Sequence, residues 1–152
     1  MDVSFVNPFL KATDDTFKTM LNVELAIGAP TLKKDAKHAF DVSGVIGLSG
    51  EAQGLISVSF PRDIAFKVVS TLIGAEVKEV GAELIDGIGE IANIIAGNAK
   101  QYLTEYNLSI SLPNVVVGAD HRIEVQSGIP TIIVPLSSPI GDFAMEVALK
   151  TK

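Results

Sequence analysis

Hydrophobic residues recur at helical spacing near the start of the chain. The repeat consists of Phe9, Leu10, Phe17, Met20 and Leu21. Residues three or four positions apart share one face of a helix, so this spacing predicts a helix with one buried face. Asn7 is a good N-cap and Pro8 is a good first helical residue. The first helix is therefore predicted to begin at Asn7-Pro8 and to run to Met20-Leu21.

Two further helices are predicted in the middle of the chain. Pro61 suits the first position of a helix, and Asp63 places a carboxylate in the first turn, where it favours the helix dipole. Gly74 is a typical residue at the end of a helix. A longer helical pattern runs from about Ala82 to Tyr106. These signals predict a short helix over 61–74 and a long helix over 82–106.

Shorter segments with alternating or β-branched apolar residues predict six strands, at about 23–27, 40–48, 54–60, 109–118, 129–136 and 143–149. Residues 33–37, Lys-Lys-Asp-Ala-Lys, are predicted to be a polar connector. The strands follow one another as hairpins and do not alternate with helices. This order favours an α+β fold with a mostly antiparallel six-stranded sheet and helices packed on one face.

Composition narrows the possible functions. The 152 residues predict a single domain spanning 1–152, and the formal net charge of −6 argues against general binding of nucleic acid. The chain contains no apolar run long enough to span a membrane, and its N-terminus lacks the features of a signal peptide. It has 0 cysteines, which excludes disulfides and thiolate metal ligands. A cytoplasmic location is the default expectation.

The long predicted helix carries the candidate functional residues. At 100° per residue, a stripe about 80° wide contains Asp86, Glu90, Asn93, Gly97 and Gln101. The opposite side contains the apolar residues Leu84, Ile88, Ile91, Ile95, Ala99 and Tyr102. A glycine inside a helix costs about 1 kcal/mol relative to alanine. We therefore expect Gly97 to mark a place where another molecule approaches closely.

The run Glu90-Ile-Ala-Asn93-Ile-Ile-Ala-Gly97-Asn98-Ala resembles the E-x-x-N…G-N helix of the CheC/CheX/FliY family of chemotaxis phosphatases. Three other stretches agree with the CheX branch, namely 7–10 (NPFL), 128–133 (GIPTII) and 141–147 (GDFAMEV). CheC-like members carry a second E-x-x-N in their first helix. Here Glu24 is the only glutamate before position 51, so a single site points to CheX.

The resemblance implies a phosphatase that hydrolyses the aspartyl phosphate of a phosphorylated CheY-like response regulator. It implies that Asn93 orients the attacking water and that Glu90 pairs with the regulator's active-site lysine. Asp86, Gly97 and Gln101 would contact the partner, with Gly97 giving clearance to a partner loop. No cofactor is expected on this chain, because the regulator would supply Mg²⁺. Positioning a reactant in this way is a large source of rate enhancement.

Several single residues allow a structural role, and others lack the spacing that a metal site, a hydrolase or a nucleotide site requires. Gly97 is compatible with close packing of a neighbouring helix, and Asn98 is read as a structural residue that bonds a nearby loop. His38 and His121 lack the spacing of metal ligands, and His121 beside Asp120 and Arg122 is predicted to lie in a solvated turn. Ser43-Gly44 lacks a G-x-S-x-G elbow, and 87–90 lacks the third glycine of a nucleotide loop.

Two alternatives to the phosphatase also remain. One is a module of the same fold that binds a phosphorylated regulator without hydrolysing it, and the other is an interaction domain of the flagellar switch. The resemblance further implies a homodimer joined through exposed sheet edges. The apolar runs 115–117 (VVV) and 132–134 (IIV) are the candidate edges, unless they lie in interior strands.

Overall fold

A computed structural model describes residues 5–32, 40–119, 121, 123 and 128–151 of the chain. The predicted connector at 33–37 lies outside these described residues, as do His38, Asp120 and Arg122. The helices are α1 (Val6–Leu21), α2 (Arg62–Ile73) and α3 (Ala82–Tyr102). The strands are β1 (Ala26–Ile27), β2 (Thr31–Leu32), β3 (Val42–Gly50), β4 (Ala52–Phe60), β5 (Leu108–Ile110), β6 (Asn114–Val117), β7 (Thr131–Ser138) and β8 (Gly141–Thr151).

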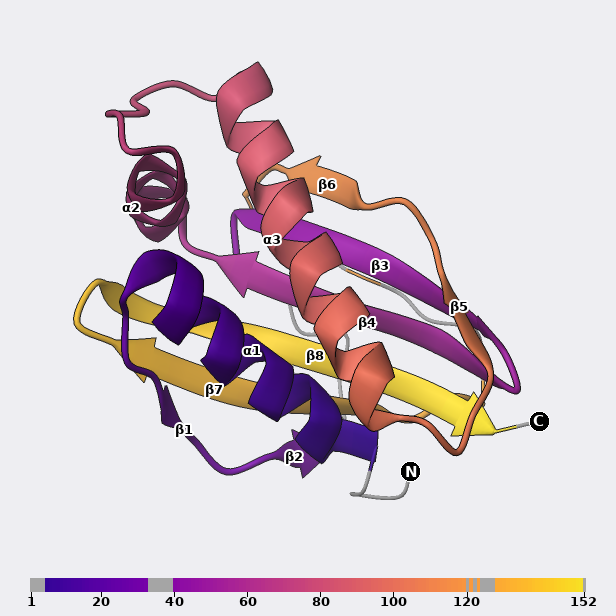
Figure 1. The fold of residues 1–152 in the computed structure, drawn as a ribbon. Coiled ribbons are helices and arrows are strands. Elements are labelled where there is room, and N and C mark those ends of the chain that lie inside the picture. Colours follow the sequence, from indigo (N-terminus) through magenta and orange to yellow (C-terminus); the bar gives the residue numbers. More distant parts are fainter. Residues whose placement is uncertain (1–4, 33–39, 120, 122, 124–127, 152) are drawn as a thin grey trace.

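The strands form one antiparallel sheet in the order β1-β7-β8-β4-β3-β5, with β2 also paired to β7 and β6 also paired to β3. All three helices lie over the same face of this sheet (Figure 1). The predicted α+β class, the antiparallel pairing and the one-sided helices are therefore confirmed. The described sheet has eight strands where the sequence predicts six. Strand β2 was not predicted because it spans two residues, too few to show alternation.

The second additional strand arises because the predicted strand over 109–118 is divided. In register, Ile110 of β5 faces Leu48, whereas Asn114 of β6 faces Val45. The two residues between Leu48 and Val45 on β3 therefore face the three residues 111–113 of the other chain segment. One extra residue in one strand is the definition of a β-bulge, which bends the strand and re-aims its side chains.

The position of β7 in the sheet shows whether the predicted edge at 132–134 is free to form a dimer. Residues Ile132 and Ile133 pair with Leu32 and Thr31 of β2, and the other side of β7 pairs with β8. The prediction that 132–134 forms a free edge is therefore wrong, because these residues lie in an interior strand. Strand β6 pairs with β3 and has no second partner strand within the described part of the chain. The run 115–117 is therefore at an edge.

The helix ends depart from prediction by small amounts. Helix α1 begins at Val6 with Phe5 as its N-cap, so Asn7 lies inside the helix and is not the predicted N-cap. Pro61 is the N-cap of α2, and the Arg62 N–H donates to the Asp41 carboxylate at 3.0 Å. Helix α2 ends as predicted at Gly74, which is left-handed. Helix α3 ends at Tyr102, one turn before the predicted Tyr106.

The core between the helices and the sheet is built around three phenylalanine rings. Phe143 of β8 stacks on Phe17 of α1 at 4.9 Å and on Phe60 of β4 at 4.8 Å between ring centroids. All three side chains are buried. Buried aromatic side chains contribute large apolar areas, and offset stacking adds to this. This cluster fixes α1 over the central strands β4 and β8.

Two glycines hold α3 close to its neighbours and so fix which of its faces is exposed. A Cβ at Gly44 of β3 would lie 2.9 Å from the Ala92 Cβ of α3. A Cβ at Gly87 of α3 would lie 2.6 Å from Cγ1 of Val69 in α2. Only glycine permits approaches this close. With its inner face held against β3 and α2, α3 presents the opposite face outward.

Candidate functional site

The outward face of α3 carries the predicted stripe. Asp86, Glu90, Asn93 and Gln101 are exposed, and Gly97 is half-buried. On the opposite side, the predicted residues Leu84, Ile88, Ile91, Ile95 and Ala99 are all buried. The 3.6-residue period therefore assigns the two faces of the helix correctly along most of its length.

Tyr102 is the exception, because it was predicted on the buried side and is 43% exposed. Its hydroxyl donates to the Asp15 carboxylate of α1 at 3.2 Å. The Lys11 ammonium lies 4.7 Å from the centre of its ring. Tyr102 lies on the side of α3 that faces α1, as the helical period predicts. At the last turn of α3, however, this side is no longer covered by the core, so the ring lies at the surface between the two helices.

Glu90 and Asn93 line a surface hollow of about 430 Å³ between α3 and the segment that runs from the β5–β6 connection into β6. Its lining residues are Ile85, Asp86, Gly89, Glu90 and Asn93 from α3, and Leu112, Pro113, Asn114 and Val115 from the facing segment. Glu90 and Asn93 are three residues apart on a helix, which places their Cβ atoms about 5–6 Å apart. The carboxylate and the amide are therefore neighbours that face one concave surface.

The polar groups of these two side chains are available to another molecule. Within the described part of the chain, neither the Glu90 carboxylate nor the Asn93 amide forms a hydrogen bond or an ion pair. Both side chains are exposed. A carboxylate can accept hydrogen bonds or pair with a cation, and a carboxamide can both donate and accept. Together they can bind a cationic group and orient a water molecule.

The structure separates the predicted site residues into two groups. Asp86 lines the same hollow as Glu90 and Asn93. Gly97 and Gln101 lie farther along α3 and are not part of its lining. Among the described residues, a Cβ at Gly97 would meet no atom within 4 Å. The alternative in which Gly97 allows a neighbouring helix of the same chain to pack closely is therefore wrong.

Asn98 has a structural contact, as expected, but to a helix. Its amide Nδ2 lies 3.4 Å from the hydroxyl oxygen of Thr16 in α1. The Thr16 hydroxyl in turn donates to the Ala12 carbonyl at 2.7 Å. Asn98 thus links α3 to α1, and the predicted bond to a loop is wrong.

His121 has a role that the sequence did not indicate. Its Nε2 lies 2.7 Å from the Ser43 hydroxyl, and its Nδ1 lies 2.7 Å from the Gly118 carbonyl. The Ser43 and Ser59 hydroxyls are 2.6 Å apart, and both serines are buried. For His121 the predicted solvated position is therefore wrong, whereas Asp120 and Arg122 lie outside the described residues. Because Ser43 has no exposed surface, these contacts satisfy buried polar groups and do not form a nucleophile that a substrate could reach.

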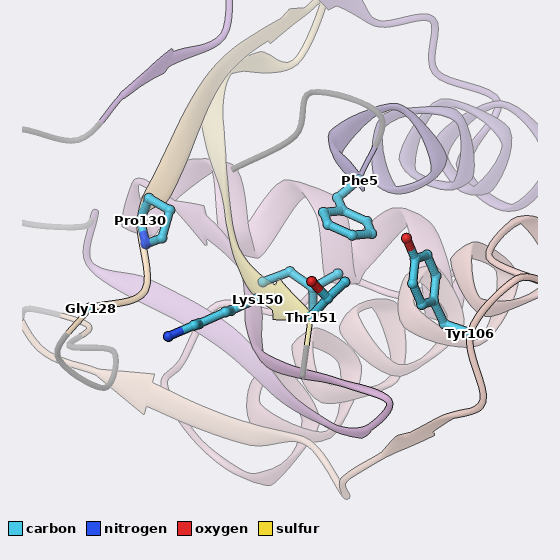
Figure 2. Close-up of a pocket in the computed structure, with 7 residues that line it drawn as sticks. Phe5, Tyr106, Gly128, Pro130, Lys150 and Thr151 are labelled. Atoms are coloured by element: carbon cyan, nitrogen blue, oxygen red, sulfur yellow. The ribbon is translucent and has the colours of Figure 1, made fainter.

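A second hollow of about 330 Å³ lies near the C-terminal end of β8. Figure 2 shows its lining, in which Phe5 and Tyr106 face one another with ring centroids 5.2 Å apart. Lys150 is the one charged side chain among the described residues that line it. The described lining of this hollow contains none of the predicted site residues and offers no acid–base pair.

The described residues contain neither a metal-binding cluster nor a membrane-spanning helix. No group of three or more His, Asp or Glu side chains is arranged to hold a metal ion there. Within the same residues, no helix is long and apolar enough to cross a membrane. Glu90 and Asn93, with Asp86 beside them, thus form the candidate site.

Comparison with known proteins identifies the family. Residues 42–137 match the family model described as chemotaxis phosphatase CheX. The chain is 29% identical over 127 residues to the CheY-P phosphatase CheX of Thermotoga maritima, which covers 82% of each chain. Among solved structures it is similar to CheX from Vibrio vulnificus, at 34% identity and a TM-score of 0.89 over 97% of this chain and 99% of that chain.

A third relative was solved together with other molecules. It is the CheX–CheY–BeF₃–Mg²⁺ complex from Borrelia burgdorferi, which matches at 28% identity and a TM-score of 0.84 over 98% of this chain and 99% of that chain. The family model alone covers more than half of the 152 residues. This chain therefore belongs to the CheX family of chemotaxis phosphatases.

Proposed function

We propose that this protein hydrolyses the aspartyl phosphate of a phosphorylated CheY-like response regulator in chemotaxis signalling. One observation carries the proposal. In a chain of the CheX family, Glu90 and Asn93 lie side by side on the exposed face of α3 and line one hollow, with no partner for either among the described residues. The Thermotoga maritima relative is named as a CheY-P phosphatase, which supports this substrate.

The proposed reaction needs little from this chain besides positioning. A water oxygen bonds to phosphorus, the bond between phosphorus and the aspartyl oxygen breaks, and the products are inorganic phosphate and a free aspartate carboxylate. The acyl phosphate is already activated, so placing the water in line gives a large rate gain. The Asn93 amide would orient that water by hydrogen bonding. The exposed position of Asn93 supports this role, because the amide can reach a group on another protein.

Glu90 would pair with the lysine of the regulator's active site and fix the approach of α3. Its carboxylate is unpaired within the described residues, and Asp86 adds a second negative charge to the same hollow. Such complementary charge orients two proteins and fixes their register. Gly97 and Gln101 would contact the partner farther along the helix. The open space at Gly97 supports this, because a partner loop can approach the helix backbone there.

The regulator would also supply the divalent metal. Mg²⁺ bound there neutralises phosphoryl charge during phosphoryl transfer. The complex of the Borrelia burgdorferi relative with CheY contains Mg²⁺, which supports this assignment. The described residues of the present chain offer no cluster of ligands for it.

We further infer a homodimer that uses an exposed sheet edge. Strand β6 supports this, because it lies beside β3 at the end of the sheet and carries Val116 and Val117 with 37% and 40% of their surface exposed. An edge strand has backbone N–H and C=O groups free for pairing. A symmetric pairing of two β6 strands would leave one catalytic site on each subunit.

The direct test is phosphate release. A purified CheY-like regulator is phosphorylated with excess small-molecule phosphodonor and Mg²⁺, and steady-state phosphate release is measured with and without this protein. Acceleration in proportion to catalytic amounts of the protein supports the phosphatase. Tight binding of the phosphorylated regulator without acceleration would instead identify a binding module. Binding that ignores the phosphorylation state would favour a switch interaction domain.

A further inference from the structure

The wall of the hollow that faces α3 is formed by Leu112, Pro113, Asn114 and Val115, and Leu112 protrudes from it. Leu112 is 86% exposed, the largest exposed fraction among the described large hydrophobic residues. On the α3 side of the same hollow, Ile85 is 39% exposed. A single exposed leucine on a protein surface is ordinary. Here, however, Leu112 and Pro113 line one concave surface with Ile85 and with the two unpaired polar groups of the candidate site.

The segment that carries Leu112 is held in place before any partner arrives. The Ser111 N–H donates to the Gly47 carbonyl at 2.9 Å, and the Gly47 N–H donates to the Ser111 hydroxyl oxygen at 2.8 Å. That hydroxyl donates to the Leu112 carbonyl at 2.8 Å. These bonds fasten the segment to β3 immediately before Leu112.

The residue after Leu112 is fastened on the other side. A Cβ at Gly89 of α3 would lie 3.4 Å from Cγ of Pro113, so the proline ring lies within ordinary packing distance of the helix. Proline also fixes its own backbone dihedral φ. Leu112 therefore sits at the crest of the bulge between two anchored residues, and binding would not have to order it. Preorganisation of this kind lowers the entropic cost of association.

We propose that Leu112, with Ile85, is the apolar docking anchor for the phosphorylated response regulator. This inference rests on the function proposed above. The charges of the hollow support that occupant, because the described residues of its lining include the carboxylates of Asp86 and Glu90 and no lysine or arginine. The complementary partner face is a cationic group with an apolar rim beside it, and the lysine assigned to the regulator's active site supplies the cation. Leu112 and Ile85 then cover the rim and exclude water from the ion pair.

The proposal predicts a separation of binding from chemistry. Leu112→Ala should raise KM for the phosphorylated regulator about tenfold, because truncation of an anchor at an interface commonly costs that much affinity. Its kcat should change by less than about twofold, because Leu112 would contribute equally to the bound substrate and the transition state. Leu112→Met restores the apolar volume and should return KM close to that of the wild type.

Leu32→Ala is the matched control. Leu32 is also an exposed leucine, at 52%, but it lies in β2 beside β7, at the opposite end of the sheet from β6. This variant should keep the wild-type KM and kcat. A Leu112→Ala protein with wild-type KM would overturn the proposal.

A second measurement separates this inference from the proposed phosphatase function. The dissociation constant is measured for the regulator loaded with beryllofluoride and Mg²⁺, a stable substitute for the phosphorylated form. If the wild type binds this complex but does not hydrolyse the phosphate, a tenfold weaker Leu112→Ala variant still supports the anchor while the phosphatase fails. If hydrolysis occurs and Leu112→Ala has the wild-type affinity, the anchor fails while the phosphatase stands. If the wild type neither binds the loaded regulator nor hydrolyses the phosphate, both the anchor and the phosphatase function are wrong.

Sedimentation equilibrium tests the competing occupant, a second copy of this chain. If Leu112→Ala weakens self-association and leaves KM and regulator affinity unchanged, Leu112 packs against a second subunit of this protein and the proposal is wrong. If self-association is unchanged while regulator affinity falls, the regulator is the occupant.

Discussion

Replacement of Gly97 by alanine should stabilise the protein. Gly97 lies inside α3, and a Cβ there would meet no atom of the described residues within 4 Å, so no contact among them opposes the higher helix propensity of alanine. That propensity favours alanine over glycine by about 0.8–1.0 kcal/mol inside a helix. For a chain of 152 residues, a gain near 1 kcal/mol corresponds to a rise in Tm of about 2–4 °C.

Gly87→Ala provides a matched comparison in the same helix. Its new Cβ would lie 2.6 Å from Cγ1 of the buried Val69, so the variant gains the same helix propensity but overpacks the contact with α2. Overpacking typically costs about 1–3 kcal/mol. Because the propensity gain is common to both variants, it cancels in the comparison. Gly97→Ala should therefore have the higher free energy of unfolding, by about 1–3 kcal/mol.

Urea denaturation of both variants and the wild type measures these differences. A larger side chain, in Gly97→Leu, should keep the free energy of unfolding at or above that of the wild type while weakening regulator binding by steric clash. Lower stability of Gly97→Ala or Gly97→Leu than of the wild type would refute this reasoning and make Gly97 a packing residue. Unchanged regulator affinity in a stable Gly97→Leu protein would refute the clearance role alone.

The other predictions concern Glu90 and assembly. Glu90→Ala should weaken binding of the beryllofluoride-loaded regulator by at least about thirtyfold, because the regulator's lysine loses its partner in a buried interface. The hydrolysis rate should fall as well. Glu90→Gln should have an affinity and a rate between those of Glu90→Ala and the wild type. Isothermal titration and phosphate release check this, and a Glu90→Ala protein with wild-type affinity and rate would count against the ion pair. Sedimentation velocity at micromolar concentration should show a dimer, and Val116→Lys on the β6 edge should shift the equilibrium toward the monomer. A wild-type protein that sediments as a single 16.0 kDa species would contradict the dimer.

The faces of α3 could be predicted from the sequence because helix periodicity is a local property. The spacing of Glu90, Asn93 and the buried Ile88 and Ile95 fixes which residues point outward, whatever the rest of the chain does. The same spacing could not show how far the core extends along the helix, so Tyr102 was placed on the buried side. The extent of the core depends on α1, which packs beside α3 and meets Tyr102 through Asp15.

The second wall of the site depends on pairing between distant strands and was not predicted. Pro113 alone marks an interruption, but the bulge exists only relative to the register of Leu48 and Val45 on β3. For the same reason the apolar run at 132–134 looked like a possible edge, although β2 pairs with it. The contact of His121 with Ser43 joins residues 78 positions apart, and no local spacing reports it.

If the Asn93 amide positions the attacking water, its removal in Asn93→Ala should abolish hydrolysis without weakening binding of the regulator. Asn93 is exposed, so truncation should leave stability within about 0.5 kcal/mol of the wild type. Asn107→Ala, which removes another exposed amide beyond the end of α3, serves as the control and should keep full activity. The measurement is phosphate release from the phosphorylated regulator at saturating concentration. Asn93→Ala should bind the beryllofluoride-loaded regulator with wild-type affinity but release phosphate at nearly the uncatalysed rate. If Asn93→Ala retains most of the wild-type kcat, Asn93 does not position the attacking water.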